Sequence, residues 1–253
     1  MDEEEAMNPQ ETSTIQAKRD PTELRVLAFD VFGTVVDWFG SVRSEVARRN
    51  LGVDAGAFAG DWRAGYQPAM AAVTRGDVGW TLIDDLHRMI LDDLLSQYQI
   101  EMSEPDRYSL NRIWHLLDPW PDSAAGLRAL HPNYILCTLS NGNLGLLTDL
   151  VRHGDLTFDC LLSAEVFRKY KPDPDTYLGV ASTFDVSPSQ VMLVAAHHND
   201  LAAARDCGLM TAYIERPQEY GPQAVKDVSP KPDNDFHARD LLNLEGQLSR
   251  VRA

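Results

Sequence analysis

Polar side chains follow three apolar runs of this sequence, at the points where a buried strand would end. They are Asp30 and Thr34 after residues 26–29, Ser140 and Asn141 after residues 134–139, and Asp200 after residues 191–196. Lys171 adds an ammonium group from a loop that Pro172 and Pro174 stiffen. Buried charges need partners, so two carboxylates and a lysine that meet at one place indicate a functional site. A carboxylate beside an ammonium group stays ionised near neutral pH, which suits a nucleophile.

The elements that must bring these side chains together alternate between strands and helices. Short apolar runs that end at polar turns predict strands over residues 26–29, 134–139, 160–163, 191–196 and 211–214. Helical patterns lie between them, over residues 122–130, 175–184 and 200–208. This alternation predicts an α/β fold with a doubly wound, Rossmann-like parallel sheet that helices cover on both faces. The carboxyl ends of parallel strands share one rim, where the polar side chains would meet.

Residues 38–118 interrupt this alternation, because their apolar residues recur at helical spacing. The first set is Leu82, Ile83, Leu86, Met89, Ile90 and Leu94, and the second is Leu110, Ile113, Trp114 and Leu117. We therefore expect a core of residues 22–37 and 119–253, an all-helical cap of residues 38–118 and a disordered acidic segment over residues 1–21. A cap inserted after the first strand would stand over the edge of the sheet where α/β proteins bind ligands.

The composition excludes several kinds of partner. Lys and Arg total 23 against 38 Asp and Glu, a net charge of −15 that repels nucleic acids and anionic membrane surfaces. No apolar run approaches the roughly 20 residues of a membrane-spanning helix. The acidic N-terminus lacks the order of a signal peptide. The three cysteines show no metal-ligand spacing and fit reduced, buried thiols. We expect a soluble, cytoplasmic protein.

Four motifs stand in order along the chain. They are FDVFGTVVD (residues 29–37), LSNGN (139–143), YKPDPDTY (170–177) and AAHHNDLAAARDCGL (195–209). Together they resemble the haloacid dehalogenase superfamily, over nearly the whole chain after about residue 22. The most similar branch is that of the type II 2-haloacid dehalogenases, whose cap carries a Trp-Arg pair that Trp62 and Arg63 match. The resemblance implies the superfamily's α/β core with a helical cap.

The resemblance also implies a reaction and its residues. Asp30 would attack the α-carbon of a short 2-haloacid, such as a haloacetate or an L-2-haloacid, expel halide and form an aspartyl ester. Water would then hydrolyse the ester to a 2-hydroxy acid. The implied catalytic residues are Asp30, Thr34, Lys171, Asp200 as the residue that positions or deprotonates the water, and Arg63. The implied substrate-binding residues are Phe32, Trp62, Ser140 for the substrate carboxylate, Asn141, Tyr177, His197 and His198. Arg63 and Asn141 would face the halide. No metal or other cofactor is expected, and a homodimer is the family-based expectation.

The alternative function is that of a Mg²⁺-dependent phosphatase, the commonest activity in this superfamily. Those enzymes carry a second aspartate two positions after the nucleophile, where this chain has Phe32, which cannot protonate a leaving group. They usually have a Gly-Asp pair in place of Ala195 and Ala196, so one carboxylate for Mg²⁺ is missing. A halide leaves without a proton, and Phe32 would help to exclude water. A binding protein without activity is a third interpretation, which the retention of Asp30 and Lys171 disfavours.

Two positions depart from the dehalogenase pattern, which usually has Ser and Asn where this chain has Ala195 and His197. His198 is aligned with an aromatic residue that commonly abuts the halide. Histidine can donate a hydrogen bond to halide, and small, hard fluoride gains most from such donors. We therefore hypothesise that His197 and His198 adapt the site to small substrates, including fluoroacetate. The alternative is that the pair caps a strand and binds Asp200.

Overall fold

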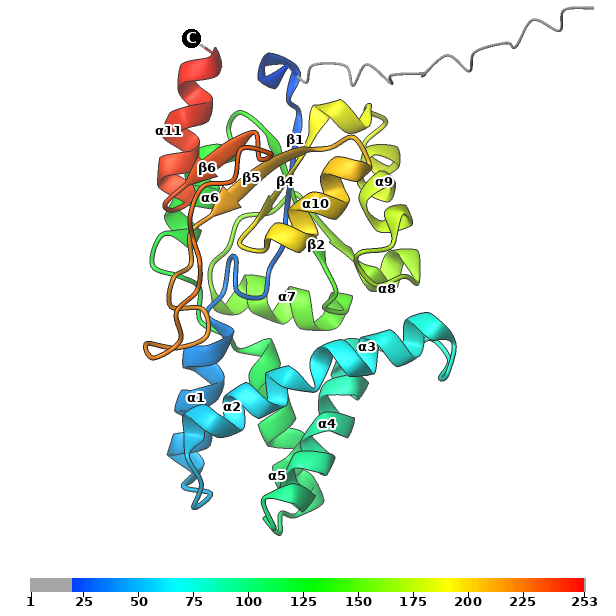
Figure 1. Ribbon diagram of the computed structural model, residues 1–253, viewed down its shortest axis with the longest axis vertical. Coiled ribbons are helices and arrows are strands. Elements are labelled where there is room, and N and C mark those ends of the chain that lie inside the picture. Colours follow the sequence, from blue (N-terminus) through cyan, green and yellow to red (C-terminus); the bar gives the residue numbers. More distant parts are fainter. Residues whose placement is uncertain (1–19, 253) are drawn as a thin grey trace, which may run out of the picture.

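The computed structural model describes residues 20–252, and a six-stranded sheet forms its centre (Figure 1). The strands are β1 (Val26–Phe29), β2 (Ile135–Ser140), β3 (Cys160–Ser163), β4 (Val191–Ala195), β5 (Met210–Ile214) and β6 (Phe236–Ala238). All pairs are parallel, in the order β3-β2-β1-β4-β5-β6. The chain therefore builds outward from β1 in both directions, which confirms the predicted doubly wound α/β fold.

Alternate side chains of the central strand pack against helices on opposite faces of the sheet. Leu27 and Phe29 belong to a buried cluster that includes residues of α6 (Ser123–Leu130), α7 (Leu144–His153) and α11 (Leu241–Arg252). Val26 and Ala28 belong to a second cluster, with residues of α9 (Pro174–Thr183) and α10 (His198–Asp206). Both faces of the strand are covered, which is why its sequence is continuously apolar rather than alternating.

Residues 38–115, between β1 and α6, form a separate group of helices in the lower part of Figure 1. They are α1 (Trp38–Arg49), α2 (Ala55–Ala64), α3 (Tyr66–Arg75), α4 (Ile83–Gln97) and α5 (Glu104–Asn111), followed by a 3₁₀ helix (Arg112–His115). Ser103 caps α5, because its side chain accepts a hydrogen bond from the Asp106 N–H. A buried cluster of aromatic and aliphatic residues runs through this group and continues into the sheet.

The turn after β1 requires glycine. Gly33 has φ of +80°, in the left-handed region that side chains rarely adopt. A Cβ atom at this position would also lie 2.2 Å from Oε1 of Glu219. Glu219 belongs to the loop after β5, so the absence of a side chain at residue 33 lets that loop approach the end of β1.

Two segments differ from the expectations. Strand β6 has no apolar run to mark it in the sequence, since only Phe236, His237 and Ala238 form it. Residues 1–19 of the segment expected to be disordered lie outside the described residues. Its last residue, Pro21, instead begins a 3₁₀ helix (Pro21–Glu23) that Asp20 caps, so the expectation is wrong there.

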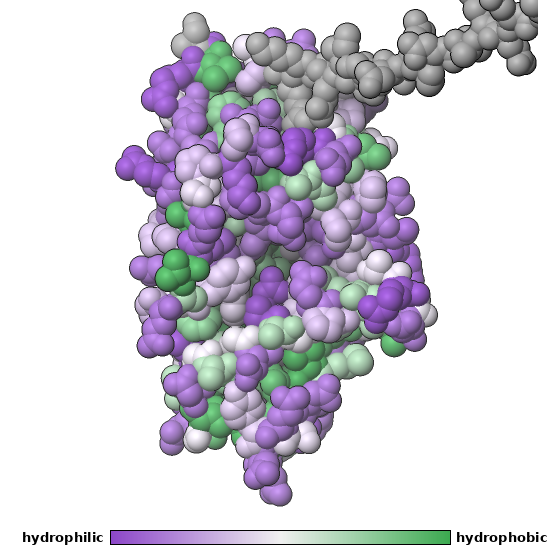
Figure 2. Space-filling view, in the orientation of Figure 1, coloured by the Kyte–Doolittle hydropathy of each residue, from purple (hydrophilic) through white to green (hydrophobic). Residues whose placement is uncertain are grey.

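The surface of the face in Figure 2 is predominantly hydrophilic, with scattered hydrophobic residues. Within residues 20–252, no helix has both the length and the apolar character needed to cross a membrane.

Candidate active site

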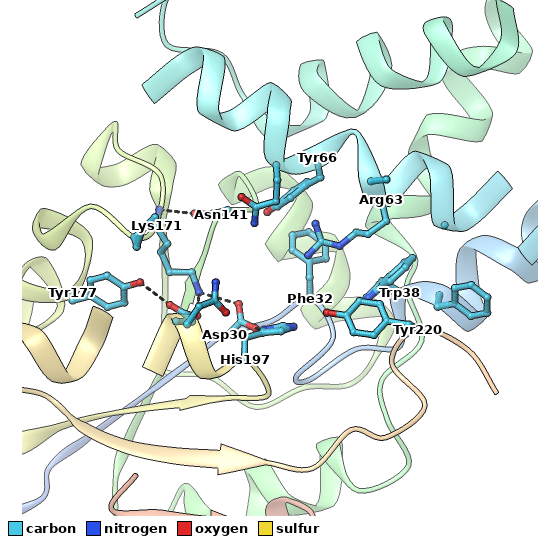
Figure 3. A pocket seen from close by; sticks show the side chains of 17 residues that line it. Asp30, Phe32, Trp38, Arg63, Tyr66, Asn141, Lys171, Tyr177, His197 and Tyr220 are labelled. Carbon is cyan, nitrogen blue, oxygen red and sulfur yellow. Dashed lines mark hydrogen bonds and ion pairs between the residues drawn. The ribbon is translucent and has the colours of Figure 1, made fainter. Parts of the chain in front are cut away.

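A cavity of about 610 Å³ opens where the carboxyl ends of the strands face the helices that follow β1 (Figure 3). The part of the chain that surrounds the sheet contributes residues after the strands and on the helices α9 and α10: Asp30, Phe32, Asn141, Lys171, Tyr177, His197, Asn199 and Asp200. From the helices come Trp38, Phe39, Arg63, Tyr66 and Gln67, and the loop after β5 adds Tyr220. One wall is therefore polar and charged, whereas the other is largely aromatic.

Asp30 is the residue on which the polar wall converges. It follows β1 directly, and its carboxylate accepts hydrogen bonds from Lys171 Nζ at 2.9 Å and from the Thr34 hydroxyl at 2.7 Å. The Nδ1 atom of His197 lies 3.0 Å from the same carboxylate. Burial by itself would raise the pKa of Asp30, but the charges of Lys171 and His197 outweigh it and hold this pKa well below its usual range. Asp30 is therefore ionised at neutral pH.

Lys171 lies between two carboxylates. Its Nζ atom is 2.9 Å from Asp30 Oδ1 and 2.5 Å from Asp200 Oδ2. Burial would lower the pKa of Lys171, but the two carboxylates outweigh it and raise this pKa, so the ammonium form persists. The other oxygen of Asp200 accepts a hydrogen bond from the Tyr177 hydroxyl at 2.7 Å. Asp200 and Tyr177 thus hold the ammonium group in front of Asp30.

His197 also lies between two carboxylates. Its Nδ1 faces Asp30, and its Nε2 is 2.8 Å from Oε1 of the fully buried Glu219. Burial would lower the pKa of His197, but the hydrogen bonds to Asp30 and Glu219 outweigh it and raise this pKa to about 9. The expectation that the histidine pair binds Asp200 is wrong, because the partners of His197 are Asp30 and Glu219.

Arg63 brings a cation to the aromatic wall. Its guanidinium carbon lies 4.0 Å from the ring centre of Tyr66 and 5.7 Å from that of Trp38. In the described part of the chain no carboxylate forms an ion pair with it, and its buried Nε has no hydrogen-bond partner. An arginine that is stacked on aromatic rings and unpaired beside a cavity can receive an anion.

Three predicted substrate-binding residues do not line the cavity. Ser140 is fully buried, and its Oγ accepts a hydrogen bond from the Gly142 N–H. Trp62 is also fully buried, and its indole N–H donates to the His87 carbonyl. His198 stacks on Tyr213 with ring centres 4.2 Å apart. The expectation that these three side chains line the substrate site is therefore corrected.

Helix geometry explains two of the corrections. Successive side chains on a helix are rotated by about 100°, so Arg63 faces the cavity while its neighbour Trp62 faces the helical core. His197 has an extended backbone before α10 begins and lines the cavity. His198, the first residue of the helix, does not line it, and Asn199, rotated by about 100° from His198, does. Thr34 does not line the cavity either, but it reaches the site through its hydrogen bond to Asp30.

Sequence reasoning missed the residues of the loop after β5. Glu219 contacts His197, accepts a hydrogen bond from the Trp38 indole at 3.3 Å and pairs with Lys226. Tyr220 lines the cavity. A glutamate in a Pro-rich segment far from the other motifs carries no signal in sequence. The only related feature in the motifs is Gly33, which has a positive φ and lacks the side chain that would collide with Glu219.

The polar wall does not suit Mg²⁺, the metal of the phosphatases that form the alternative function. Phe32 and Ala196 offer no side-chain oxygen where those enzymes carry aspartates. The ammonium of Lys171 lies between Asp30 and Asp200, at the place where a cation would bind both. Residues 20–252 also contain no group of three or more His, Cys, Asp or Glu side chains arranged to hold a metal ion.

The chain is similar to several known proteins. Residues 24–208 match the haloacid dehalogenase-like hydrolases. The (S)-2-haloacid dehalogenase 4A of Burkholderia cepacia is 31% identical over 208 residues, which cover 78% of this chain and 87% of that protein. Among solved structures, that of a defluorinating L-2-haloacid dehalogenase has 42% sequence identity to this chain. Its TM-score is 0.87, and the match covers 92% of this chain and 99% of that one. A second L-2-haloacid dehalogenase is 43% identical, with a TM-score of 0.86 over 89% of this chain and 99% of that one.

Proposed function

The chain belongs to the haloacid dehalogenase-like hydrolases, and from this premise we propose that it hydrolyses the carbon–halogen bond of short 2-haloacids. The three relatives described above, which are 31 to 43% identical, are named (S)-2- or L-2-haloacid dehalogenases, which supports this substrate class. One observation carries the proposal: an ionised Asp30 shares a cavity with Arg63, a cation that has no carboxylate partner among the described residues. Displacement of halide needs such a nucleophile and such an anion receptor.

The proposed reaction has two steps. Asp30 attacks the carbon that bears the halogen, a C–O bond forms, and the halide departs with the pair of electrons of the broken bond. Arg63 and the amide of Asn141 receive the halide, and the rings of Phe32 and Trp38 exclude water from this side of the cavity. Water then hydrolyses the aspartyl ester and releases a 2-hydroxy acid. No proton is needed for the first departure, so Phe32 is compatible with it.

The substrate carboxylate needs other donors than Ser140. Asn199 and Gln67 line the cavity and carry amide groups, and the lysine ammonium stands nearby. We propose that these two amides orient the carboxylate while Lys171 stays between its own two carboxylates. The substrate is then held by neutral donors and by one guanidinium, Arg63.

Asp200 is better placed to position Lys171 than to deprotonate water. Both of its oxygens already accept hydrogen bonds, from Lys171 and from Tyr177. We therefore propose that Asp200 keeps Asp30 ionised through Lys171, in place of the water-activating role expected from the sequence.

We further propose that residues 38–118 act as a cap over a core of residues 22–37 and 119–253. Arg63 and Tyr66 reach the cavity from the helices and face Asp30 across it (Figure 3). Polar contacts also join the two parts, since Asp84 accepts a hydrogen bond from Asn143 at 2.9 Å.

Fluoroacetate is included in the proposed substrate range, but no longer on the basis of the histidine pair. Both ring nitrogens of His197 already face the carboxylates of Asp30 and Glu219, and His198 lies outside the cavity. A relative of 42% identity is described as defluorinating, which supports the inclusion. Release of chloride from chloroacetate without release of fluoride from fluoroacetate would remove fluoroacetate from the range and leave the rest of the proposal intact.

Halide release tests the function directly. The purified protein is incubated with chloroacetate, with L-2-chloropropionate and with fluoroacetate, in the presence of EDTA, and free halide is measured. We expect release that EDTA does not diminish and that Asp30→Asn abolishes. Strong Mg²⁺-dependent turnover of p-nitrophenyl phosphate, without halide release, would instead establish the alternative function of a phosphatase.

The ester intermediate is tested by a single turnover in ¹⁸O-labelled water with enzyme in excess. The label is expected on Asp30, because water attacks the ester carbonyl and its oxygen stays on the enzyme. Label found only in the product would exclude the ester.

A further inference from the structure

A buried series of charged side chains reaches Asp30 from the loop after β5. Lys226 Nζ donates to Oε2 of Glu219 and, at 2.7 Å, to the Ala196 carbonyl. The other oxygen of Glu219 lies 2.8 Å from His197 Nε2, and His197 Nδ1 lies 3.0 Å from Asp30 Oδ2. Glu219 is fully buried, so its charge is shielded from solvent and acts on its two neighbours.

The two oxygens of Asp30 have different numbers of donors. Oδ2 has two, the Thr34 hydroxyl at 2.7 Å and His197 Nδ1 at 3.0 Å. The proton of that hydroxyl points to Asp30, because Thr34 Oγ1 itself accepts from the Ala196 N–H at 2.9 Å. Among residues 20–252, Oδ1 has one donor, Lys171 Nζ. A carboxylate oxygen has two in-plane lone pairs, so Oδ1 retains a free one and Oδ2 does not.

This difference decides which oxygen attacks. Oδ1 has the free electron pair and becomes the bridging oxygen of the ester. Oδ2 then becomes the carbonyl oxygen, and it keeps both donors without any rearrangement. Donors that are already in place where negative charge develops are the most effective kind of electrostatic catalysis.

On the basis of the proposed dehalogenase function, we propose that His197 is a catalytic residue of the second step. Its Nδ1–H and the Thr34 hydroxyl bind Oδ2 and stabilise the negative charge that forms there when water attacks the ester. Glu219 and Lys226 are positioning residues, which hold the imidazole ring in place with both nitrogens protonated.

The step is balanced as follows. The water oxygen forms a bond to Cγ of Asp30, and the π electrons of the carbonyl move to Oδ2, where the two donors receive them. These electrons return, the bond from Cγ to Oδ1 breaks, and Oδ1 leaves as the hydroxyl oxygen of the product. Of the two protons of the water, one ends on this oxygen and the other is released to solvent. Asp30 therefore regains its charge with one oxygen from water, and the hydrogen bonds of Oδ2 persist throughout.

Charged groups on several elements face His197 and set its protonation. Glu219 and Asp30 contact it directly, while Lys226 and Lys171 act through these two carboxylates. In the free enzyme their sum holds His197 as the cation, with a pKa of about 9. Formation of the ester removes the charge of Asp30, so the pKa of His197 in the ester lies below this value. Glu219 is the carboxylate that then remains to keep the ring charged.

The test follows one turnover with enzyme in excess over chloroacetate, by rapid quenching. Chloride release reports formation of the ester, and the mass of the intact protein reports the carboxymethyl group on Asp30. In His197→Ala we expect ester formation within a few-fold of the wild-type rate. Hydrolysis of the ester should slow by about 10²- to 10³-fold, which is the effect of losing one such donor, so the adduct accumulates.

Two further variants separate catalysis from mere structure. His197→Asn keeps an N–H donor without a titrating charge. It should recover part of the hydrolysis rate. In the wild type the rate of ester hydrolysis should decline at alkaline pH, where His197 loses its charge, and in His197→Asn this decline should disappear. Glu219→Gln keeps the shape of the side chain but removes its charge, so the decline should move to lower pH than in the wild type. His198→Asn makes the same change outside the cavity and should leave both steps unchanged.

The outcomes are distinguishable. If His197→Ala hydrolyses the ester at the wild-type rate, or if His197→Asn retains the alkaline decline, the role of His197 is wrong. If the variants lose ester formation alone, His197 acts in the first step and the proposal is again wrong. If the wild-type protein releases no chloride and forms no adduct, the dehalogenase function itself fails.

Discussion

The ammonium nitrogen of Lys171 lies 2.9 Å from Oδ1 of Asp30, although 141 positions separate the two residues in the sequence. Only 8 to 9% of either side chain is exposed to solvent. A contact between opposite charges in so dry a place determines the ionisation of both groups. It also leaves each group dependent on the other, and the first prediction follows from this dependence.

Lys171→Met should damage both activity and stability. The variant leaves Asp30 and Asp200 buried together without the cation between them, and breaking a buried pair in this way costs about 3–5 kcal/mol. The pKa of Asp30 should rise, because burial is then opposed only by His197. We expect kcat at pH 7 to fall by about 10²-fold or more. We also expect an acid limb in the pH dependence of kcat/KM that the wild type lacks. Urea unfolding and the pH profile of kcat/KM measure these effects. A variant whose kcat/KM at acidic pH follows that of the wild type would contradict the role of Lys171.

The stability of the protein should fall between about pH 6.5 and pH 9. The pKa of His197 is raised from its ordinary value of 6.5 to about 9 in the folded protein. A raised pKa contributes stability that is complete below the unfolded value and is lost as pH rises through the folded value. The free energy of unfolding from urea titrations should decrease across this window, and less steeply in His197→Asn. If the free energy of unfolding decreases equally steeply with pH in the two proteins, His197 is not held as a cation in the folded protein.

Arg63→Lys should lose activity although it keeps the charge. The guanidinium stacks 4.0 Å from Tyr66 and presents a planar set of donors, which a lysine cannot reproduce. Stacking contacts of this kind contribute about 0.5–2 kcal/mol, so kcat/KM for chloroacetate should fall about 2- to 30-fold. Arg75→Lys is the control, since Arg75 is a largely exposed arginine that pairs with Asp77. Similar losses in both variants would indicate a general effect of the substitution.

Gly33→Ala should destabilise the protein more than Gly76→Ala does. Both glycines have nearly the same φ, +80° and +79°, so both alanines incur about 1–2 kcal/mol of backbone strain. A Cβ at Gly76 meets open space, whereas one at Gly33 meets Glu219 at 2.2 Å. We expect Gly33→Ala to cost about 1–3 kcal/mol more in urea unfolding and to impair ester hydrolysis through Glu219. Equal costs would mean that the loop after β5 is free to move aside.

The sequence determined the fold class and part of the site because both depend on local patterns. Continuous apolar runs such as residues 26–29 are typical of strands buried on both faces, and polar residues at their ends fall at the shared rim of a parallel sheet. Asp30 and Asp200 were identified in this way, and Lys171 as the ammonium group of a loop that two prolines stiffen. Lys171 lies between the two carboxylates. The family's match over residues 24–208 confirms the resemblance that the four motifs indicated.

The tertiary structure decided which neighbours of these residues reach the cavity. Adjacent residues such as His197 and His198 face different directions, because a helix begins between them, and only His197 lines the cavity. Glu219 could not be foreseen either, since a buried carboxylate is recognised by its partners and not by its spacing. The close approach of Gly33 and the ammonium of Lys226 bring it to His197. Strand patterns are local and can be read from the chain, whereas the direction of a side chain and the charges around it depend on long-range packing.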